Sequence, residues 1–348
     1  MPRLLSSAHL SDTPTLALAE LNSQGTLFTN LCQIEAAVQL AAASNASLVV
    51  LPENAFCFGN QALAAPFFDA LKDWAGQLAR VYGVYLLAGT LPCQYRPDGS
   101  RVFGDKLRQV SLLFDPAGDC IARYDKIHLF KAQVTDTTGN YDESQTFEAG
   151  DTLTVAATEL GNLGLMVCYD LRFAHLAIRL REAGAQLITA PSAFTRATGR
   201  LHWQVLLTAR ALDSQCLVAG CGQFGEHVFY RQGQPECRQT WGHSLLVDAN
   251  GQPLATSSIA LPVYDTHQDT DTDTARYPLS LAANSWLPNA ADNAHTIPIP
   301  QAGRVLLGNW QREAQSQIRQ QLDLAYSRQQ AAGAWQTPHQ TPTPQISG

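Results

Sequence analysis

The sequence has no long uninterrupted run of apolar residues, no cluster of lysine and arginine, and no C-x-x-C pair of cysteines. A membrane-spanning helix needs about 18 or more apolar residues in a row, so none is expected, and the N-terminus lacks the apolar region of a signal peptide. The formal charge is −7, from 23 basic and 30 acidic residues. A mildly acidic chain without a basic patch is a poor partner for nucleic acid or an anionic membrane.

The cysteines are scattered rather than paired. Several of the eight lie inside apolar runs, and they occupy positions 32, 57, 93, 120, 168, 216, 221 and 237. This distribution is typical of reduced, mostly buried thiols and offers neither a disulfide framework nor a zinc site. We therefore expect a cytoplasmic protein that holds no metal.

Short apolar strands alternate with amphipathic helices along most of the chain. Residues 43–56 resemble residues 183–194: each segment is a helix end, a four-residue apolar strand and a loop that closes on phenylalanine. A repeated helix–strand unit suggests two similar halves, hence two sheets packed face to face with helices outside. The expected fold class is α/β, as a four-layer α–β–β–α sandwich.

One stretch near the C-terminus has a different composition. Residues 265–274 are acidic, polar and almost without apolar side chains, so they cannot bury enough surface to fold alone. We expect a single domain over residues 1–328 with a polar insertion at about 257–300. The end of the chain, 329–348, is rich in Gln, Thr and Pro and is expected to be disordered.

Cys168 ends a short apolar strand, 163–167, and a helical pattern follows from Ala174. Free N–H groups and the dipole at the start of a helix favour the thiolate, which is the nucleophilic form of cysteine. A lone cysteine in an apolar run is also a common small core residue. This stretch alone leaves both interpretations open.

Two charged residues stand next to other predicted strands. Glu53 follows the apolar strand 48–51, where it is either a functional carboxylate or an acid placed near a helix start. Lys126 and His128 lie on the same face of a segment that alternates like a strand. Lysines on strands are often solvated edge residues. His128 fits a core or supporting role. Folds of alternating strands and helices keep their chemistry at strand ends, so the three positions form a candidate site.

With a glutamate, a lysine and a cysteine in this order, the sequence resembles the nitrilase superfamily of carbon–nitrogen hydrolases. The similarity covers about residues 15–256 and resumes at 304–328. The matching motifs are Leu51-Pro52-Glu53, Tyr124-Asp125-Lys126-Ile127-His128-Leu129-Phe130, Val167-Cys168-Tyr169-Asp170-Leu171-Arg172-Phe173, Pro191-Ser192-Ala193-Phe194, Thr198-Gly199, His202-Trp203 and Gly242-His243-Ser244.

The resemblance implies a Glu53–Lys126–Cys168 triad, with Glu143 as a second glutamate that orients Lys126. Cys168 attacks an amide carbonyl and forms a thioester, while Glu53 moves the proton and the reaction releases ammonia. Lys126 and the backbone N–H of Tyr169 stabilise the oxyanion. Neither a metal nor an organic cofactor is implied.

Within the superfamily, the motifs are similar to the Nit-type amidases, whose members act on deaminated glutathione or, as ω-amidases, on α-ketoglutaramate. The resemblance implies that Arg172 binds a substrate carboxylate and that Thr198, in a Thr-Gly loop, contacts the keto end, with Tyr169 and Phe194 beside them. We expect a carboxylate-bearing amide such as deaminated glutathione. An ω-amidase, a nitrilase and an idle scaffold with this fold are the alternatives.

Two departures from the family pattern concern the pocket. Lys131 stands where an aspartate is common, and Ala174-His175 stand where Pro-Glu is common. Members of the family usually pair through the helices next to the cysteine, so the resemblance also implies a homodimer.

Overall fold

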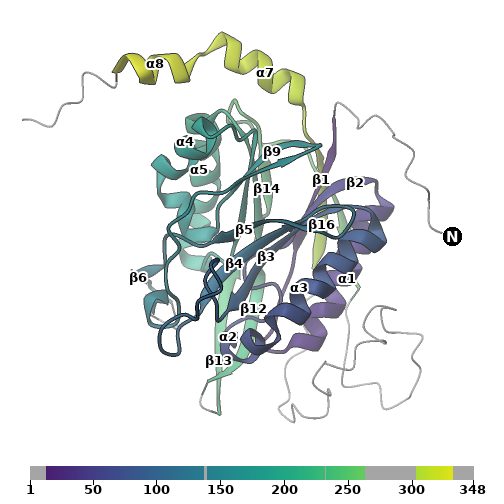
Figure 1. The fold of residues 1–348 in the computed structure, drawn as a ribbon, viewed down its shortest axis with the longest axis vertical. Helices are drawn as coiled ribbons and strands as arrows, with labels where there is room; N and C mark the ends of the chain where they lie inside the picture. The colour runs from purple at the N-terminus through teal and green to yellow at the C-terminus, as the bar shows by residue number, and fades with distance from the viewer. Residues whose placement is uncertain (1–12, 137–138, 232, 263–302, 332–348) are drawn as a thin grey trace, which may run out of the picture.

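The computed structural model describes residues 13–136, 139–231, 233–262 and 303–331, and two stacked β-sheets form its centre (Figure 1). The larger sheet has seven strands in the order β15-β16-β1-β2-β3-β4-β5. Its strands are β1 (Thr15–Glu20), β2 (Ala46–Val50), β3 (Tyr85–Cys93), β4 (Arg108–Phe114), β5 (Cys120–Asp125), β15 (Ser257–Ala260) and β16 (Arg304–Asn309).

The smaller sheet has five strands in the order β14-β11-β10-β9-β8. Strand β10 runs parallel to both β9 and β11, whereas β8 and β14 close the edges as antiparallel strands. The strands are β8 (Val155–Thr158), β9 (Gly161–Leu165), β10 (Leu187–Ser192), β11 (Leu217–Gly222) and β14 (Leu245–Val247).

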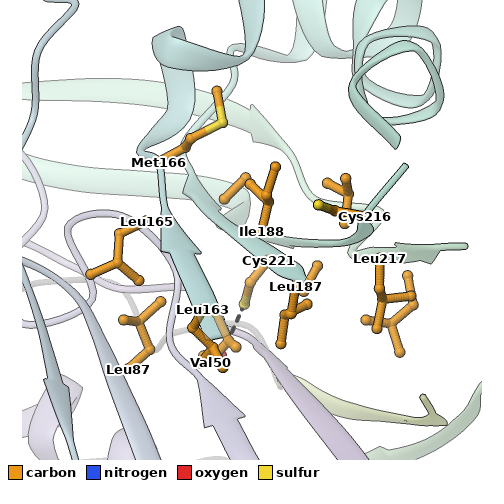
Figure 2. Close-up of a cluster of buried hydrophobic side chains, with 14 of the residues drawn as sticks. Val50, Leu87, Leu163, Leu165, Met166, Leu187, Ile188, Cys216, Leu217 and Cys221 are labelled. Atoms are coloured by element: carbon orange, nitrogen blue, oxygen red, sulfur yellow. Dashed lines mark hydrogen bonds between the residues drawn. The ribbon is translucent and has the colours of Figure 1, made fainter. Parts of the chain in front are cut away.

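The apolar faces of the two sheets meet in a core that excludes water (Figure 2). Val50 and Leu87 from the larger sheet face Leu163 and Leu165 from the smaller one, and all four side chains are fully buried. Cys221 lies in the same layer, where its Sγ donates a hydrogen bond of 3.1 Å to the carbonyl oxygen of Val50. Burial of these aliphatic side chains is the main source of the attraction between the sheets.

Helices cover the outer face of each sheet. On the larger sheet these are α1 (Leu27–Ala43) and α3 (Phe68–Tyr82), and on the smaller sheet α4 (Ala174–Glu182) and α5 (Arg196–Ser214). Helix α3 illustrates the pattern, since Leu71, Trp74, Ala75 and Leu78 recur at helical spacing and are all buried. The four-layer α–β–β–α sandwich is thus confirmed.

The two similar segments lie in different sheets. The first contains the last residue of α1 and strand β2, and the second begins directly after α4 and contains strand β10. The remaining elements are α2 (Gln61–Ala64), the 3-10 helices η1 (Ala65–Phe67), η2 (Glu143–Gln145) and η3 (Cys168–Arg172), α7 (Arg312–Gln321) and α8 (Leu324–Ala331).

Two hairpins stand apart from the main sheets, and the sequence patterns missed both. They pair β6 (Lys131–Gln133) with β7 (Asn140–Asp142), and β12 (Phe224–Arg231) with β13 (Gln234–Trp241). Fully buried His227 anchors the second hairpin. Burial lowers the pKa of its ring to about 3, so the ring is neutral. A neutral ring donates one hydrogen bond and accepts another, which fits its 2.6 Å contacts with the carbonyl of Ser23 and the hydroxyl of Thr240.

The first residues of the expected insertion are structured. Ser257–Ala260 form β15, which pairs with β16 at the edge of the larger sheet. The rest of the expected insertion from residue 263 lies outside the described residues, as does the tail from 332. Helix α8 runs through Ala331, past the point where the tail was expected to begin.

Candidate active site

Three loops bring Glu53, Lys126 and Cys168 together. Glu53 follows β2, Lys126 follows β5 directly, and Cys168 opens η3 just after β9. The Nζ of Lys126 lies 2.7 Å from Oε1 of Glu53 and 2.8 Å from Oε2 of Glu143, so the ammonium bridges two carboxylates. Lys126 is 1% exposed and Glu53 2% exposed, which makes this a buried ion cluster.

Cys168 occupies a sharp turn. Its backbone φ is 49°, a left-handed conformation that is rare for a residue with a side chain and is often found where function holds it in place. Fully buried Asp170 supports the turn by accepting hydrogen bonds from the backbone N–H groups of Val167 and His128, at 2.9 and 3.0 Å. The hydroxyl of Tyr124 donates a third bond, of 2.7 Å, to the same carboxylate. Asp170 therefore ties the cysteine turn to the segment that carries Lys126.

The ion cluster carries more negative than positive charge. Burial alone would lower the pKa of Lys126, but the charges of Glu143 and Glu53 outweigh it and raise that pKa above its usual value. Burial raises the pKa of Glu143, which Lys126 opposes and Glu53 reinforces. One cation shared by two carboxylates cannot neutralise both, so the Glu143 carboxylate of this cluster takes up a proton more readily than a solvated one.

The pKa of Cys168 lies well above that of an ordinary thiol. Burial is the main cause and Glu53 adds to it, while Lys126 and a hydrogen bond from the backbone of Ala193 oppose it. The expectation that a helix start holds a thiolate here is therefore wrong. The five-residue 3-10 helix η3 is too short to offset the loss of solvation.

The four residues expected to bind substrate line one narrow pocket above Cys168, with a volume of about 10 Å³: they are Tyr169, Arg172, Phe194 and Thr198. The guanidinium of Arg172 lies 5.8 Å from the ring centre of Tyr169 and 5.4 Å from that of Phe194. Thr198 belongs to the first turn of α5 rather than to a loop, because the side chain of Thr195 caps that helix.

Three further polar residues at the site were not singled out from the sequence. Gln109 donates a 3.0 Å hydrogen bond to Oε1 of Glu53, and Gln223 donates one of 3.1 Å to the backbone carbonyl of Glu53. Arg238 reaches the pocket from β13. It lies in a polar stretch with no pattern that would have marked it.

Neither of the two departures from the family pattern is among the residues that line the pocket. Lys131 is paired with Asp142 at 2.9 Å and its side chain is 75% exposed, so its charge is largely solvated. His175 packs edge-on against His128 and Phe173.

The model of the carbon–nitrogen hydrolase family matches residues 15–259. This chain belongs to that family. A deaminated glutathione amidase of Yersinia enterocolitica is 40% identical over 261 residues, which cover 72% of this chain and 87% of that protein. A deaminated glutathione amidase of Synechocystis is 36% identical over 70% of this chain and 87% of its own length.

Solved structures share the fold of this carbon–nitrogen hydrolase. Nit3 of Saccharomyces cerevisiae, a member of branch 10 of the nitrilase superfamily, has a TM-score of 0.62 at 23% identity and covers 93% of this chain and 99% of its own. The family match and the curated relatives show that the chain is a Nit-type member of the nitrilase superfamily and an amidase.

Membrane and metal sites were sought in the described ranges. No helix there is long and apolar enough to cross a membrane. No group of three or more His, Cys, Asp or Glu within those ranges could hold a metal ion.

Proposed function

We propose that this amidase cleaves its substrate through a thioester on Cys168. The observation that carries the proposal is the buried ammonium of Lys126 between Glu53 and Glu143, at 2.7 and 2.8 Å, because both of these carboxylates line the pocket that contains Cys168. Such a cluster is costly to bury and has no value for packing alone. Perturbed buried charges beside a nucleophile are typical of catalytic sites.

In the first half of the reaction, Glu53 takes the thiol proton as the sulfur attacks the amide carbonyl. The raised pKa of Cys168 makes this base necessary, because the thiol is protonated at neutral pH. The carbonyl oxygen becomes an oxyanion near the ammonium of Lys126 and the backbone N–H of Tyr169. One such preorganised donor lowers the barrier by about 3–4 kcal/mol.

Collapse of the tetrahedral intermediate breaks the C–N bond. Glu53 returns its proton to the leaving nitrogen, and the acyl group stays on Cys168 as a thioester. In the second half, Glu53 removes a proton from water, which attacks the thioester. The C–S bond then breaks, the acid is released, and Glu53 gives the proton back to the sulfur of Cys168. Glu143 accepts hydrogen bonds from Lys126 and from the backbone of Phe130, at 2.8 and 2.7 Å, and so keeps the ammonium in place.

Arg172 favours a substrate with a carboxylate on its acyl half. Its guanidinium is held between two aromatic rings in the pocket wall and suits the planar fork of a carboxylate. The relatives named deaminated glutathione amidase point to the same substrate class. We propose deaminated glutathione as the preferred substrate and α-ketoglutaramate as the second.

The leaving group differs between these two substrates. The amide next to the keto-acid half of deaminated glutathione is secondary, so its cleavage releases the dipeptide cysteinylglycine instead of the expected ammonia. α-Ketoglutaramate is a primary amide and releases ammonia. Both reactions yield 2-oxoglutarate, which is therefore the product to measure.

A homodimer and a cytoplasmic location complete the proposal. Helix α5 leaves Leu201, Val205 and Leu212 exposed by 62%, 66% and 46%, on one side of the helix next to the cysteine turn. An apolar stripe of this kind fits a surface covered by a second copy. All eight cysteines are free, as suits a reducing compartment.

Arg172→Ala tests the substrate assignment. We expect KM for deaminated glutathione and α-ketoglutaramate to rise, with a loss of about 2–4 kcal/mol in kcat/KM, because the charge contact exists before and during the reaction. Neutral aliphatic amides should change little. Equal slowing of neutral and carboxylate-bearing amides would mean that Arg172 supports the cysteine turn instead.

A further inference from the structure

A second, larger cavity adjoins the catalytic pocket. It has a volume of about 500 Å³, against about 10 Å³ for the pocket above Cys168. Phe130, Glu143 and Arg238 line both spaces, so the two are neighbours across a shared wall. The pocket above Cys168 is much the smaller of the two spaces, so the second half of a bulky substrate must extend beyond it.

Arg238 is the cation of this shared wall. Its guanidinium carbon lies 4.8 Å from the ring centre of Tyr141 and 5.5 Å from that of Phe58, so aromatic faces fix its position. One terminal nitrogen donates a 3.0 Å hydrogen bond to the carbonyl of Ala193. Its Nε is buried and has no hydrogen-bond partner among the described residues, so a ligand in the cavity would meet the terminal nitrogens. These nitrogens carry four of the five N–H groups of a guanidinium, and the hydrogen bond to Ala193 uses one of the four, which leaves donors suited to binding an anion.

The rest of the cavity wall suits a peptide. Asn54, Asn60, Gln61 and Gln145 contribute amide side chains, which can both donate to and accept from peptide groups. The acids Asp142 and Glu143 in the same wall are already paired, with Lys131 at 2.9 Å and Lys126 at 2.8 Å. Glu236 lines the cavity as well, two positions before Arg238 on β13.

The two arginines define a direction through the site. Arg172 and Thr198 line the catalytic pocket and not the larger cavity, whereas Arg238 lines both. With the carboxylate of the acyl half at Arg172 and the amide carbon at Cys168, the amine half extends away from Arg172, past Glu143.

We propose that the larger cavity is a leaving-group subsite, which takes an amine that is a short peptide and binds its terminal carboxylate at Arg238. This assignment rests on the proposed function, because it takes Cys168 as the point of attack and Arg172 as the acyl anchor. Such a subsite makes the enzyme selective for the amine that it releases as well as for the acid that it forms.

Three substrates with one acyl group isolate the subsite. They are deaminated glutathione, its C-terminal amide, which lacks the terminal charge, and α-ketoglutaramate, which lacks the peptide. Formation of 2-oxoglutarate is followed for each with glutamate dehydrogenase and NADH. For Arg238→Ala we expect kcat/KM to fall about 30-fold for deaminated glutathione, mainly through KM, as for loss of a hydrogen bond to a charged group.

The two other substrates should lose several-fold less in the same variant. Arg238→Lys keeps the charge and should recover part of the loss. Arg196→Ala is the matched control, since Arg196 is an exposed arginine that contacts Gln239 of the same strand at 3.5 Å and lines neither space. Circular dichroism establishes that each variant is folded.

A binding measurement separates this proposal from the proposed function. Cysteinylglycine is titrated into the wild type and Arg238→Ala and followed by saturation-transfer NMR. Binding to the wild type that weakens at least tenfold in the variant supports the subsite, even if the wild type hydrolyses none of the three substrates and the proposed function fails. Equal losses for all three substrates, or dipeptide binding that is absent or independent of Arg238, overturn the subsite.

Discussion

Replacing Lys126 with methionine tests whether the ion cluster has the charge imbalance described above. Methionine has a similar shape but no charge, so Glu53 and Glu143 lose the ammonium that each contacts within 2.8 Å. Removing one partner of a buried ion pair costs about 3–5 kcal/mol. The side chain of Glu143 is 20% exposed, which places the expected loss of unfolding free energy near the lower bound, about 3 kcal/mol at pH 7.5.

The loss should depend on pH in a defined direction. Without Lys126, the burial and the repulsion from Glu53 that raise the pKa of Glu143 in the folded state are no longer opposed. The folded variant then binds more protons than the unfolded chain, so its stability increases as the pH falls through that raised value. The gap to the wild type should therefore narrow between pH 7.5 and pH 5.5.

Urea unfolding followed by tryptophan fluorescence at both pH values measures this gap, with Lys106→Met, at an exposed lysine, as the control. Turnover of the Lys126 variant should fall about 10³-fold or more, since an oxyanion donor and the partner of the base are lost together. A stability loss below about 1 kcal/mol, or one that is unchanged between the two pH values, would refute the account of an over-charged buried cluster.

Three further outcomes are expected. Cys168→Ala should abolish 2-oxoglutarate formation while the circular dichroism spectrum stays unchanged; measurable turnover above the buffer blank would exclude the thioester route. Asp170→Asn should lower the unfolding free energy by about 2 kcal/mol and reduce kcat, because each carboxylate oxygen takes part in two contacts and an amide nitrogen cannot accept a hydrogen bond; wild-type stability in urea would contradict its role in the cysteine turn. Val205→Asp should shift the mass seen in light scattering from dimer to monomer, and a monomeric wild type would remove the dimer proposal.

The sequence predicted those parts of the fold that depend on strong local patterns. The apolar strands and amphipathic helices of the sandwich could be predicted because each buries one face or both, and this burial produces a local pattern of apolar residues. The hairpin β12–β13 could not, since its second strand contains Pro235 and several polar residues. The first strand is held by the contact of His227 with Ser23, which is distant in the sequence.

The site shows the same division. The positions of Glu53, Lys126 and Cys168 next to predicted strands indicated that these residues form one site. Glu143 was predicted from the family resemblance. The protonation state of Cys168 could not be predicted in this way, because it depends on burial and on charges from segments far apart in the chain. Arg238 could not be found for a related reason: its place in the pocket is set by the hairpin that the local pattern did not reveal.

The position of β16 has a consequence for how the chain reaches its native state. Strand β1 pairs with β16 along its whole length, and Thr15 and Asn309 form a hydrogen bond across 294 positions of sequence. During synthesis from the N-terminus, β1 can join β2 early, but its other edge keeps unpaired backbone groups until β16 has emerged. Contacts of such long range slow folding, and an open strand edge is a template for aggregation. The pairing of β1 with β16, and the ion pair of 2.7 Å between Arg304 and buried Glu20 at its end, therefore cannot form until late in synthesis.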